Sequence, residues 1–418
     1  MAQLSDDCFA FGGDLMRIED AAALIARNLR PEGDAERVEI GHADGRILAA
    51  DLLATFPIPP FTNSAVDGYA VRHADLAGAS VSRFRVTDRV EAGALASGAI
   101  GQGEAIRIFT GAPMPDGADT VFMQEDVRIV DKVAVELPSG LKCGANVRPA
   151  GEDIAQGSLA LARGQRLRPQ DIALAAALGQ THLTVARRLR VAVFSTGNEL
   201  VSPGQALRRP QLYDSNRFML AALLRRLGCD VSDLGILRDE PLGLAQALKQ
   251  AARDHDLIVT SGGVSTGEAD HVKKAVESIG KLVFWRMAIK PGRPVAMGVI
   301  DGVPFIGLPG NPVASFVTQA YVVRPAALAL MGAHVPQLIT MPVRAAFSYK
   351  KKSGRREFVR AHLRRTDNGE CEAIKFAREG AGLLSSMVAT DGLLELADDV
   401  TRVEPGDHVG FIAYELLF

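Results

Sequence analysis

The feature that most constrains the fold is the alternation of strand-like and helix-like segments between Arg190 and Gly332. Apolar runs such as "RVAVFST" and "DLIVTSGG" alternate with amphipathic segments such as "SNRFMLAALLRRLG" and "PLGLAQALKQAARD". Nearly continuous apolar strands are typical of a sheet with both faces covered, and helices of this length can connect one parallel strand to the next. The pattern predicts a parallel, doubly wound α/β domain over residues 188–334.

Helical patterns occur on both sides of a segment with a different character. They cover "RIEDAAALIARNL" (Arg17–Leu29), the stretch Asp44–Leu53 and "PQDIALAAALG" (Pro169–Gly179). Apolar residues at helical spacing favour packing of such segments against one another. We therefore expect residues 1–53 and 149–187 to form one composite domain.

Two further regions have the composition of β domains. Residues 54–148 are rich in Gly, Pro and short β-branched runs, which predicts a mostly β domain inserted into the composite domain. Residues 335–418 return to short alternating runs, for which a β-barrel or a sandwich is expected. The basic run "YKKKSGRR" (Tyr349–Arg356) lies there, and we interpret it as a solvent-exposed turn rather than a polyanion site.

Charge and cysteine usage exclude several functional classes. The 418 residues carry 47 basic and 49 acidic side chains, and this balance provides no general attraction for nucleic acid. The four cysteines lack C-x-x-C spacing, which argues against a zinc site or a disulfide framework. The first residues have no signal-peptide pattern, and no uninterrupted apolar run approaches the ~18 residues of a membrane span. We expect a cytoplasmic protein that binds neither nucleic acid nor membrane.

Three loops of the predicted α/β domain suit an anionic ligand. "STGNEL", "TSGGVSTGEAD" and "LPGNPVASF" each follow a predicted strand. Ligands of open α/β sheets bind beyond the carboxyl ends of the strands, where glycines and hydroxyls let backbone amides approach an oxyanion. One glycine after a strand is usually only a tight turn, but three such loops at one edge favour a phosphate or nucleotide. The candidate binding residues are Ser195, Thr196, Gly197, Ser261, Gly262, Gly263, Ser265, Thr266, Pro309, Gly310, Asn311 and Ser315.

Charged residues are expected at the same edge. The carboxylates of Glu199, Asp239 and Asp270 would repel a phosphate unless a divalent cation lay between them, and Mg²⁺ is the usual cation. Helix capping is an equally good interpretation of each acid taken alone. Lys290 and Arg293 bracket the Pro-Gly turn of "KPGRP". Taken alone, this pair is more typical of a charged surface turn, but beside the acidic and hydroxyl loops it is a candidate oxyanion clamp. The P-loop and Rossmann signatures do not occur in the sequence.

The order of these motifs resembles that of the MoeA family, the molybdopterin molybdenumtransferases, which also includes the gephyrin E domain. The resemblance rests on "GGVSTGEAD", "KPGRP" and "LPGNPVAS", and it extends to "PPFTNSAVDGYAV", "IFTGAPMPDGADTV", "NVRPAGEDI", "STGNEL" and "LYDSN". These motifs cover nearly the whole chain. A family member is expected to have a composite domain with a β insertion, an α/β molybdopterin-binding domain and a C-terminal β-barrel.

The resemblance also implies a late step of molybdenum cofactor biosynthesis. Members of the family bind adenylated molybdopterin and molybdate, cleave the adenylate with Mg²⁺, insert the metal and release AMP. They form homodimers in which the β insertion of one subunit faces the α/β domain of the other. Contact with the adenylyltransferase that performs the preceding step, and with proteins that mature molybdoenzymes, is implied as well.

The resemblance assigns roles to particular residues. Mg²⁺ is implied on Asp239 and Asp270. Lys290 matches the first lysine of the family's K-P-G-K-P, whereas Arg293 replaces the second; it keeps the charge but holds an oxyanion in a different geometry. In the C-terminal region, Arg360 in "EFVRA" and Ser385 or Ser386 in "LLSSM" resemble residues near molybdate. The implied catalytic residues are Asp67, Thr110, Arg148, Asp153, Glu199, Asp270, Lys290 and Arg293.

Two other functions are compatible with parts of the sequence. The α/β domain alone resembles the molybdopterin adenylyltransferases, but those enzymes normally lack the other three domains. The gephyrin E domain also anchors membrane receptors, which makes a non-catalytic binding module a second alternative. Neither alternative accounts for the whole set of motifs.

Overall fold

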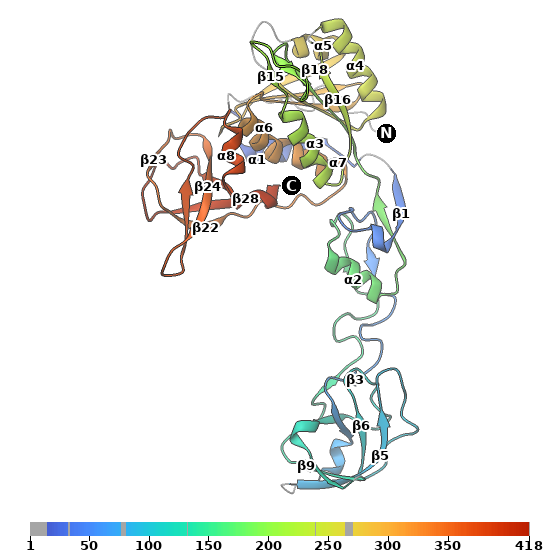
Figure 1. The fold of residues 1–418 in the computed structure, drawn as a ribbon. Coiled ribbons are helices and arrows are strands. Elements are labelled where there is room, and N and C mark those ends of the chain that lie inside the picture. The colour runs from blue at the N-terminus through green and yellow to red at the C-terminus, as the bar shows by residue number, and fades with distance from the viewer. Residues whose placement is uncertain are drawn as a thin grey trace.

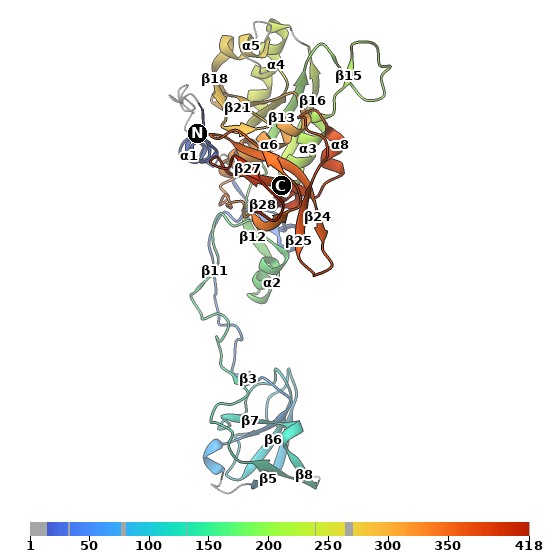
Figure 2. The same ribbon diagram turned by 90° about the vertical axis from the view of Figure 1, so that its left-hand side faces the viewer.

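The computed structural model describes residues 15–31, 34–76, 81–131, 133–238, 240–263 and 271–417. The molecule is elongated (Figure 1). A β domain lies at one end, and the α/β domain and the C-terminal β domain lie together at the other (Figure 2). A small domain and a pair of extended segments connect the two ends.

The α/β domain contains a sheet with the strand order β16-β13-β17-β21-β20-β18. The first four strands in this order are parallel, while β20 and β18 are antiparallel to their neighbours. The bounds are β13 (Arg190–Thr196), β16 (Asp230–Leu237), β17 (Leu257–Ser261), β18 (Gly280–Arg286), β20 (Pro294–Ile300) and β21 (Val303–Leu308).

The antiparallel edge differs from the fully parallel sheet expected from the sequence, and connection length explains the difference. A parallel crossover needs about a dozen residues or more. β20 and β21 are joined only by Asp301 and Gly302, whose φ angles of 49° and 84° suit a two-residue hairpin turn. The connection 287–293 between β18 and β20 is also too short for a crossover.

Helices cover both faces of this sheet, as a doubly wound domain requires. Val191 and Val193 of β13 pack in one buried cluster with α3 and the helical run that follows β21, whereas Ala192 and Phe194 pack in another with α4 and α5. This alternation is the two-residue period of a strand buried on both sides. The helices are α3 (Asn216–Arg226), α4 (Pro241–Asp254), α5 (His271–Ile279), α6 (Pro312–Thr318), the π-helix η4 (Gln319–Val323) and α7 (Arg324–Leu330).

The run from α6 to α7 is apolar enough to be compared with a membrane span. Over Pro312–Leu330 it has 19 residues and a mean hydropathy of 1.3. It is therefore long enough to span a membrane, although the sequence contains no uninterrupted apolar run of that length. However, 94% of it is buried inside the protein. It is the central helix of the α/β core, where its apolar side chains contact the sheet, α1 and the C-terminal domain.

The N-terminal helix packs differently from the sequence expectation. α1 (Ile18–Asn28) contacts α7 and η4 of the α/β domain rather than α2 (Pro169–Ala177). The stretch Asp44–Leu53 consists of a turn, with Gly45 at φ 71°, isolated bridges and a two-residue strand at its end, rather than a helix. The small connecting domain is instead held by strand pairs, β1 (Ala35–Glu39) with β12 (His182–Ala186) and β2 (Leu52–Leu53) with β11 (Leu159–Leu161).

The inserted domain at the far end of the molecule is β structure. Its sheet has the order β7-β4-β6-β5-β9-β8, and β3 pairs with β10 at the side of the connecting segments. Two buried apolar clusters fill its interior. The strands are β3 (Asn63–Ser64), β4 (Gly68–Val71), β5 (Val81–Val90), β6 (Glu104–Ile108), β7 (Thr120–Met123), β8 (Arg128–Asp131), β9 (Ala134–Pro138) and β10 (Val147–Arg148).

The C-terminal domain is a closed barrel. Its strands follow the order β24-β25-β22-β28-β26, and pairing of β26 with β24 closes the ring. The bounds are β22 (Met341–Ala345), β24 (Arg356–Arg365), β25 (Cys371–Lys375), β26 (Gly392–Leu396) and β28 (His408–Ala413), with the flanking pair β23 (Tyr349–Lys350) and β27 (Arg402–Val403).

The basic run Tyr349–Arg356 is a turn between β23 and β24 with an exposed tip at 352–354, as expected, but two of its cations are held by the protein. Lys351 is buried, and its ammonium group donates to the carbonyl oxygens of Asp398 and Val400. Arg356 forms ion pairs with Glu19 and Glu395. Lys351 and Arg356 therefore stabilise contacts of the barrel with its own loops and with α1.

Candidate active site

A cavity of about 440 Å³ lies at the carboxyl edge of the parallel strands. The loops after β13, β17 and β21 form most of its wall, as the sequence predicted for a ligand edge. Asn198 and Pro294 also contribute and were not among the sequence candidates. The lining residues are Thr196, Gly197, Asn198, Glu199, Gly262, Gly263, Pro294, Pro309, Gly310 and Asn311.

Two glycines permit the close approach of the loops after β13 and β17. Gly262 and Gly263 have φ angles of 88° and 65°, a region that side chains rarely adopt. A Cβ atom on Gly262 would lie 2.7 Å from the backbone oxygen of Thr196, and one on Gly263 would lie 2.5 Å from the Thr196 Cγ2 atom. The glycines of "TSGG" are thus required for packing as well as for an exposed backbone.

Buried hydrogen bonds hold these loops together from beneath. The Asn216 amide donates to Ser261 Oγ at 2.8 Å and to the Gly310 carbonyl oxygen at 2.7 Å. Ser195 Oγ donates to Asp214 Oδ1 at 3.1 Å. The motif "LYDSN" therefore ties together the three ligand loops, and Ser195 and Ser261 face this buried network rather than the cavity.

The remaining sequence candidates at this edge lie in different surroundings. Glu199 is exposed and lines the cavity, while Ser315 is fully buried inside α6. Asp239, Ser265, Thr266 and Asp270 lie outside the described residues. Among the described residues, there is no group of three or more His, Cys, Asp and Glu side chains able to hold a metal.

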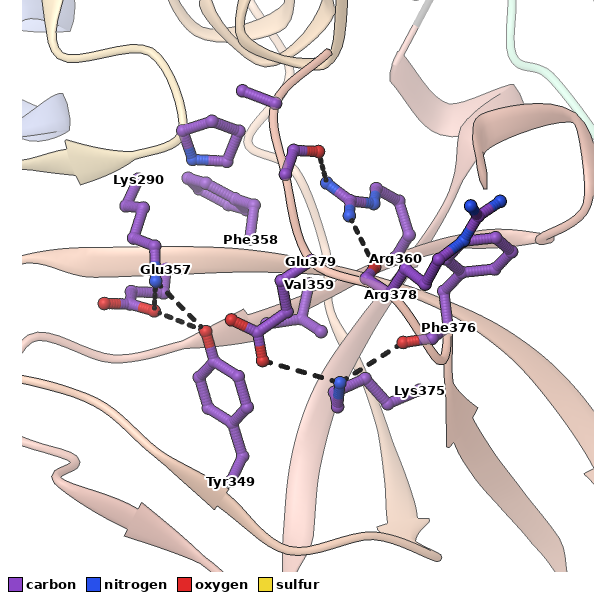
Figure 3. Close-up of a pocket in the computed structure, with 13 residues that line it drawn as sticks. Lys290, Tyr349, Glu357, Phe358, Val359, Arg360, Lys375, Phe376, Arg378 and Glu379 are labelled. Atoms are coloured by element: carbon purple, nitrogen blue, oxygen red, sulfur yellow. Dashed lines mark hydrogen bonds and ion pairs between the residues drawn. The ribbon is translucent and has the colours of Figure 1, made fainter. Parts of the chain in front are cut away.

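A second cavity, of about 140 Å³, lies between the α/β domain and the barrel (Figure 3). Lys290 and Pro291 line it from the α/β side. Lys375 and Arg378 add positive charge from the barrel, as does Arg360 from β24. Glu357 and Glu379 line it as well, and Glu379 pairs with Lys375 at 3.6 Å, so four cations face two carboxylates. This excess of positive charge around so small a space favours a compact anion.

Arg360 is held in place by the barrel itself. Its side chain is buried and donates to the carbonyl oxygens of Gly380, at 3.1 Å, and Arg378, at 3.2 Å. The two serines that the sequence analysis linked to Arg360 lie in α8 (Leu384–Val388) and do not line this cavity. Ser385 is exposed, and the buried Ser386 donates its hydroxyl to the Leu383 carbonyl oxygen.

The "KPGRP" turn lies between the two cavities. Lys290 and Pro291 line the cationic cavity, and Pro294 lines the carboxyl-edge cavity. Arg293 is exposed on the outer side of the turn, where it lines a further depression together with Lys290. The first turn of α6, which follows the loop after β21, also contacts the C-terminal domain, because the Val313 amide donates to the Ala381 carbonyl oxygen at 2.9 Å.

The candidates in the inserted domain form a separate group. Asp67 Oδ1 accepts hydrogen bonds from the Thr110 amide at 2.8 Å and from its hydroxyl at 2.7 Å, and these bonds lower the pKa of Asp67. Arg148 and Asp153 are exposed where the connecting segments meet this domain. The inserted domain is at the opposite end of the molecule from the α/β domain, so a single chain does not bring these residues to the two cavities (Figures 1 and 2).

The sequence analysis missed Asp214, Asn216, Tyr349 and Glu357. "LYDSN" was recognised as a motif, but its role beneath the loops depends on contacts between segments far apart in the chain. Glu357 is adjacent to Phe358 and three residues from Arg360, so its position beside Lys290 becomes visible only when the barrel is placed against the α/β domain.

Comparisons with known proteins follow the same division of the chain. Residues 16–179 match the MoeA N-terminal region (domain I and II), residues 192–329 match a probable molybdopterin binding domain, and residues 342–414 match the MoeA C-terminal region (domain IV). A molybdopterin molybdenumtransferase of Haemophilus influenzae is 35% identical over 402 residues, which cover 94% of this chain and 98% of that protein. The chain belongs to the MoeA family.

Other MoeA-family proteins agree with this assignment. Molybdopterin molybdenumtransferase 2 of Mycobacterium tuberculosis is 36% identical over 379 residues, 88% of this chain and 92% of that protein. The crystal structure of a molybdopterin biosynthesis MoeA protein from Pyrococcus horikoshii is similar with a TM-score of 0.81 and 29% identity, and covers 96% of this chain and 100% of that chain. The MoeA-family chain is thus a transferase of molybdenum cofactor biosynthesis, a molybdopterin molybdenumtransferase.

Proposed function

We propose that the enzyme inserts molybdate into adenylated molybdopterin in an Mg²⁺-dependent reaction that releases AMP. The observation that carries this proposal is the pair of cavities joined by the "KPGRP" turn. The cavity of glycine-rich loops suits a phosphate-bearing ligand, and the cationic cavity beside it suits a tetrahedral dianion. Two different anions next to each other are what this reaction requires.

The loops of the carboxyl edge bind the adenylated substrate in this proposal. Backbone amides at Gly197, Gly263 and Gly310 are proposed to donate to phosphate oxygens, and the buried Asn216 network keeps the loops in register. The Gly262 amide instead donates to the Leu308 carbonyl oxygen at 3.0 Å. Ser265 and Thr266, which are outside the described residues, are proposed as further hydroxyl donors. Pre-positioned donors of this kind stabilise negative charge that develops during cleavage of a phosphoanhydride.

The chemistry of the carboxyl edge fits a magnesium ion. Glu199 places an exposed carboxylate at the wall of a cavity lined by glycine loops, and this combination requires a cation when a phosphate binds. Asp239 and Asp270 are proposed as the ligands, and two carboxylates are enough because Mg²⁺ keeps several waters and substrate oxygens. When bound, Mg²⁺ would neutralise the pyrophosphate.

Molybdate is proposed to bind in the cationic cavity against Lys290 and Arg360. Charge and size decide this choice, since both side chains recognise a tetrahedral dianion rather than a particular metal. In this proposal a molybdate oxygen attacks the phosphorus of the AMP group, which breaks the phosphoanhydride and leaves molybdopterin with its own phosphate. The Mo–O bond to AMP would then break as the dithiolene sulfurs bind the metal, so AMP is released and no side chain has to form a covalent intermediate. None of Cys143, Cys229 and Cys371 lines either cavity.

We further propose that the enzyme acts as a homodimer in the cytoplasm. The Asp67–Thr110 pair belongs to the inserted domain, which lies at the opposite end of the elongated chain from the α/β domain, and a second copy could bring its own pair to these cavities. The adenylyltransferase of the preceding step is a proposed source of the substrate, and a protein that matures molybdoenzymes is a proposed acceptor of the product.

One assay separates the proposed reaction from the alternatives. The purified protein is incubated with adenylated molybdopterin, molybdate and Mg²⁺, and nucleotides are measured by chromatography. AMP release that requires molybdate is expected. Consumption of ATP with unadenylated molybdopterin would indicate an adenylyltransferase, and absence of both reactions would indicate a binding module.

A further inference from the structure

Lys290 belongs to the α/β domain, but its side chain is held by the barrel. The short strand β19 (Ile289–Lys290) pairs in parallel with the beginning of β24, so that Lys290 is opposite Glu357. The first cation of "KPGRP" is therefore in register with a residue three positions before Arg360 on the same barrel strand. This pairing fixes the lysine relative to the cationic cavity.

The Lys290 ammonium group has two acceptors at the cavity wall (Figure 3). Nζ is 3.1 Å from Glu357 Oε2 and 3.3 Å from the hydroxyl oxygen of Tyr349. That hydroxyl donates to the same Glu357 oxygen at 2.8 Å. Glu357 Oε1 accepts from Arg355 Nε at 3.0 Å, so both oxygens of the carboxylate are engaged.

Burial and hydrogen bonding distinguish the two partners and favour the ionised form of Glu357. The Glu357 side chain is 1% exposed, whereas that of Lys290 is 44% exposed. Burial alone raises the pKa of Glu357, but the hydrogen bonds from Tyr349 and Lys290 outweigh it and leave the pKa below its ordinary value. Burial and Glu357 raise the pKa of Tyr349, so the phenol stays protonated and donates.

These contacts limit which N–H bonds of the Lys290 ammonium group can donate to a ligand. An ammonium group has three N–H bonds, and two of them are directed to Glu357 and Tyr349. We propose that Glu357 is a positioning residue for Lys290, which together with Tyr349 aims the third N–H at an oxyanion in the cationic cavity. The inference rests on the proposed function, in which molybdate binds there, and it extends that function to a residue that does not itself hold the oxyanion.

A different role for Glu357 makes the opposite prediction. If the carboxylate only weakened the positive field of the cavity, its neutralisation would tighten oxyanion binding. If it positions Lys290, neutralisation releases the flexible lysine side chain and weakens binding. Because both carboxylate oxygens are already bonded to cations or to the phenol, the structure favours the positioning role.

The test is a double-mutant cycle with Glu357→Gln and Lys290→Met, read out as the molybdate KM of AMP release and as molybdate binding by calorimetry. Glu357→Gln is expected to raise the molybdate KM about tenfold, the effect of one lost charge-assisted hydrogen bond. The KM for adenylated molybdopterin should change by less than about twofold. In the Lys290→Met background, Glu357→Gln should have almost no further effect, because it acts through the lysine.

Control variants distinguish a failure of the positioning role from a failure of the proposed oxyanion site. Glu372→Gln removes a barrel carboxylate that pairs with Arg364 outside the cavity and should leave the molybdate KM unchanged. Tighter binding in Glu357→Gln, or additive effects in the double variant, would overturn the positioning role. A normal molybdate KM in Lys290→Met would instead contradict the proposed oxyanion site itself. If Glu357→Gln does not fold, Tyr349→Phe in the same cycle should give a KM increase of about threefold, and an unchanged KM there would overturn the inference.

Discussion

Replacing Asn216 with alanine should damage catalysis more than it damages stability. Asn216 is the first residue of α3 and is almost fully buried. Its amide nitrogen donates to Ser261 at the end of β17 and to Gly310 in the loop after β21, and so connects the two segments. The substitution removes both connections without touching the lining of the cavity.

The size of the effect follows from these two bonds. Each contributes about 1 kcal/mol net, so the unfolding free energy of the domain should fall by about 2 kcal/mol. The fold should survive, because the clusters on both faces of the sheet are unchanged. The loops at Ser261 and Gly310, however, lose their fixed spacing, and a displacement of about 1 Å in a ligand site can reduce the rate on the order of a hundredfold.

The assay pairs thermal melting with kinetics of AMP release on the same preparations. We expect a modest decrease in Tm and a fall in kcat/KM of about a hundredfold. Asn368→Ala makes the same chemical change in an exposed barrel loop and should leave kcat/KM unchanged. Activity of Asn216→Ala within about twofold of the parent enzyme would refute the argument that this network sets the geometry of the site.

Three further predictions address stability, assembly and metal use. The carboxylate of Asp256 accepts hydrogen bonds from Arg187 and Arg190, and these outweigh the effect of burial and lower the pKa of Asp256. Asp256→Asn should therefore destabilise the protein by about 3 kcal/mol at pH 7. The difference in Tm between the variant and the parent should shrink as the pH falls through the lowered pKa, because the parent then loses the charge as well. Mixing the inactive variants Asp67→Ala and Asp270→Ala should restore activity in hybrid dimers, and no recovery in hybrids shown to form would count against a shared site. Asp270→Asn should reduce AMP release about a hundredfold with partial rescue at high Mg²⁺, since asparagine still caps a helix; near-normal activity would remove its metal role.

Much of the α/β domain could be predicted because its signals are local. Continuous apolar strands, amphipathic helices and the glycine-containing loops after three of the strands indicate a doubly wound sheet and a ligand edge without any knowledge of distant contacts. The direction of β18 and β20 depends on short connections, which the sequence also contains in Asp301-Gly302. The Asp301-Gly302 turn predicts an antiparallel hairpin, whereas the helical segments before β18 and after β21 favour parallel strands.

The remaining differences arise from contacts between domains. α1 has the apolar stripe of any amphipathic helix, and nothing in that stripe indicates that it packs on α7 instead of α2. Lys290 looked like one end of a surface turn, whereas the structure pairs it with Glu357 of the barrel. Spacing along the chain shows which residues follow strands, but it does not show which domain supplies the opposite wall of a cavity.

The central claim is that the oxyanion binds between the "KPGRP" turn and the barrel while the nucleotide binds at the carboxyl edge. A crystal structure of the enzyme with tungstate and AMP tests it directly, because tungsten is located by its anomalous scattering. The account predicts a tungsten peak in the cavity lined by Lys290 and Arg360, with the AMP phosphate at the loops that contain Gly197, Gly262 and Gly310. A tungsten peak at any other place, with the cationic cavity empty at saturating tungstate, would contradict it.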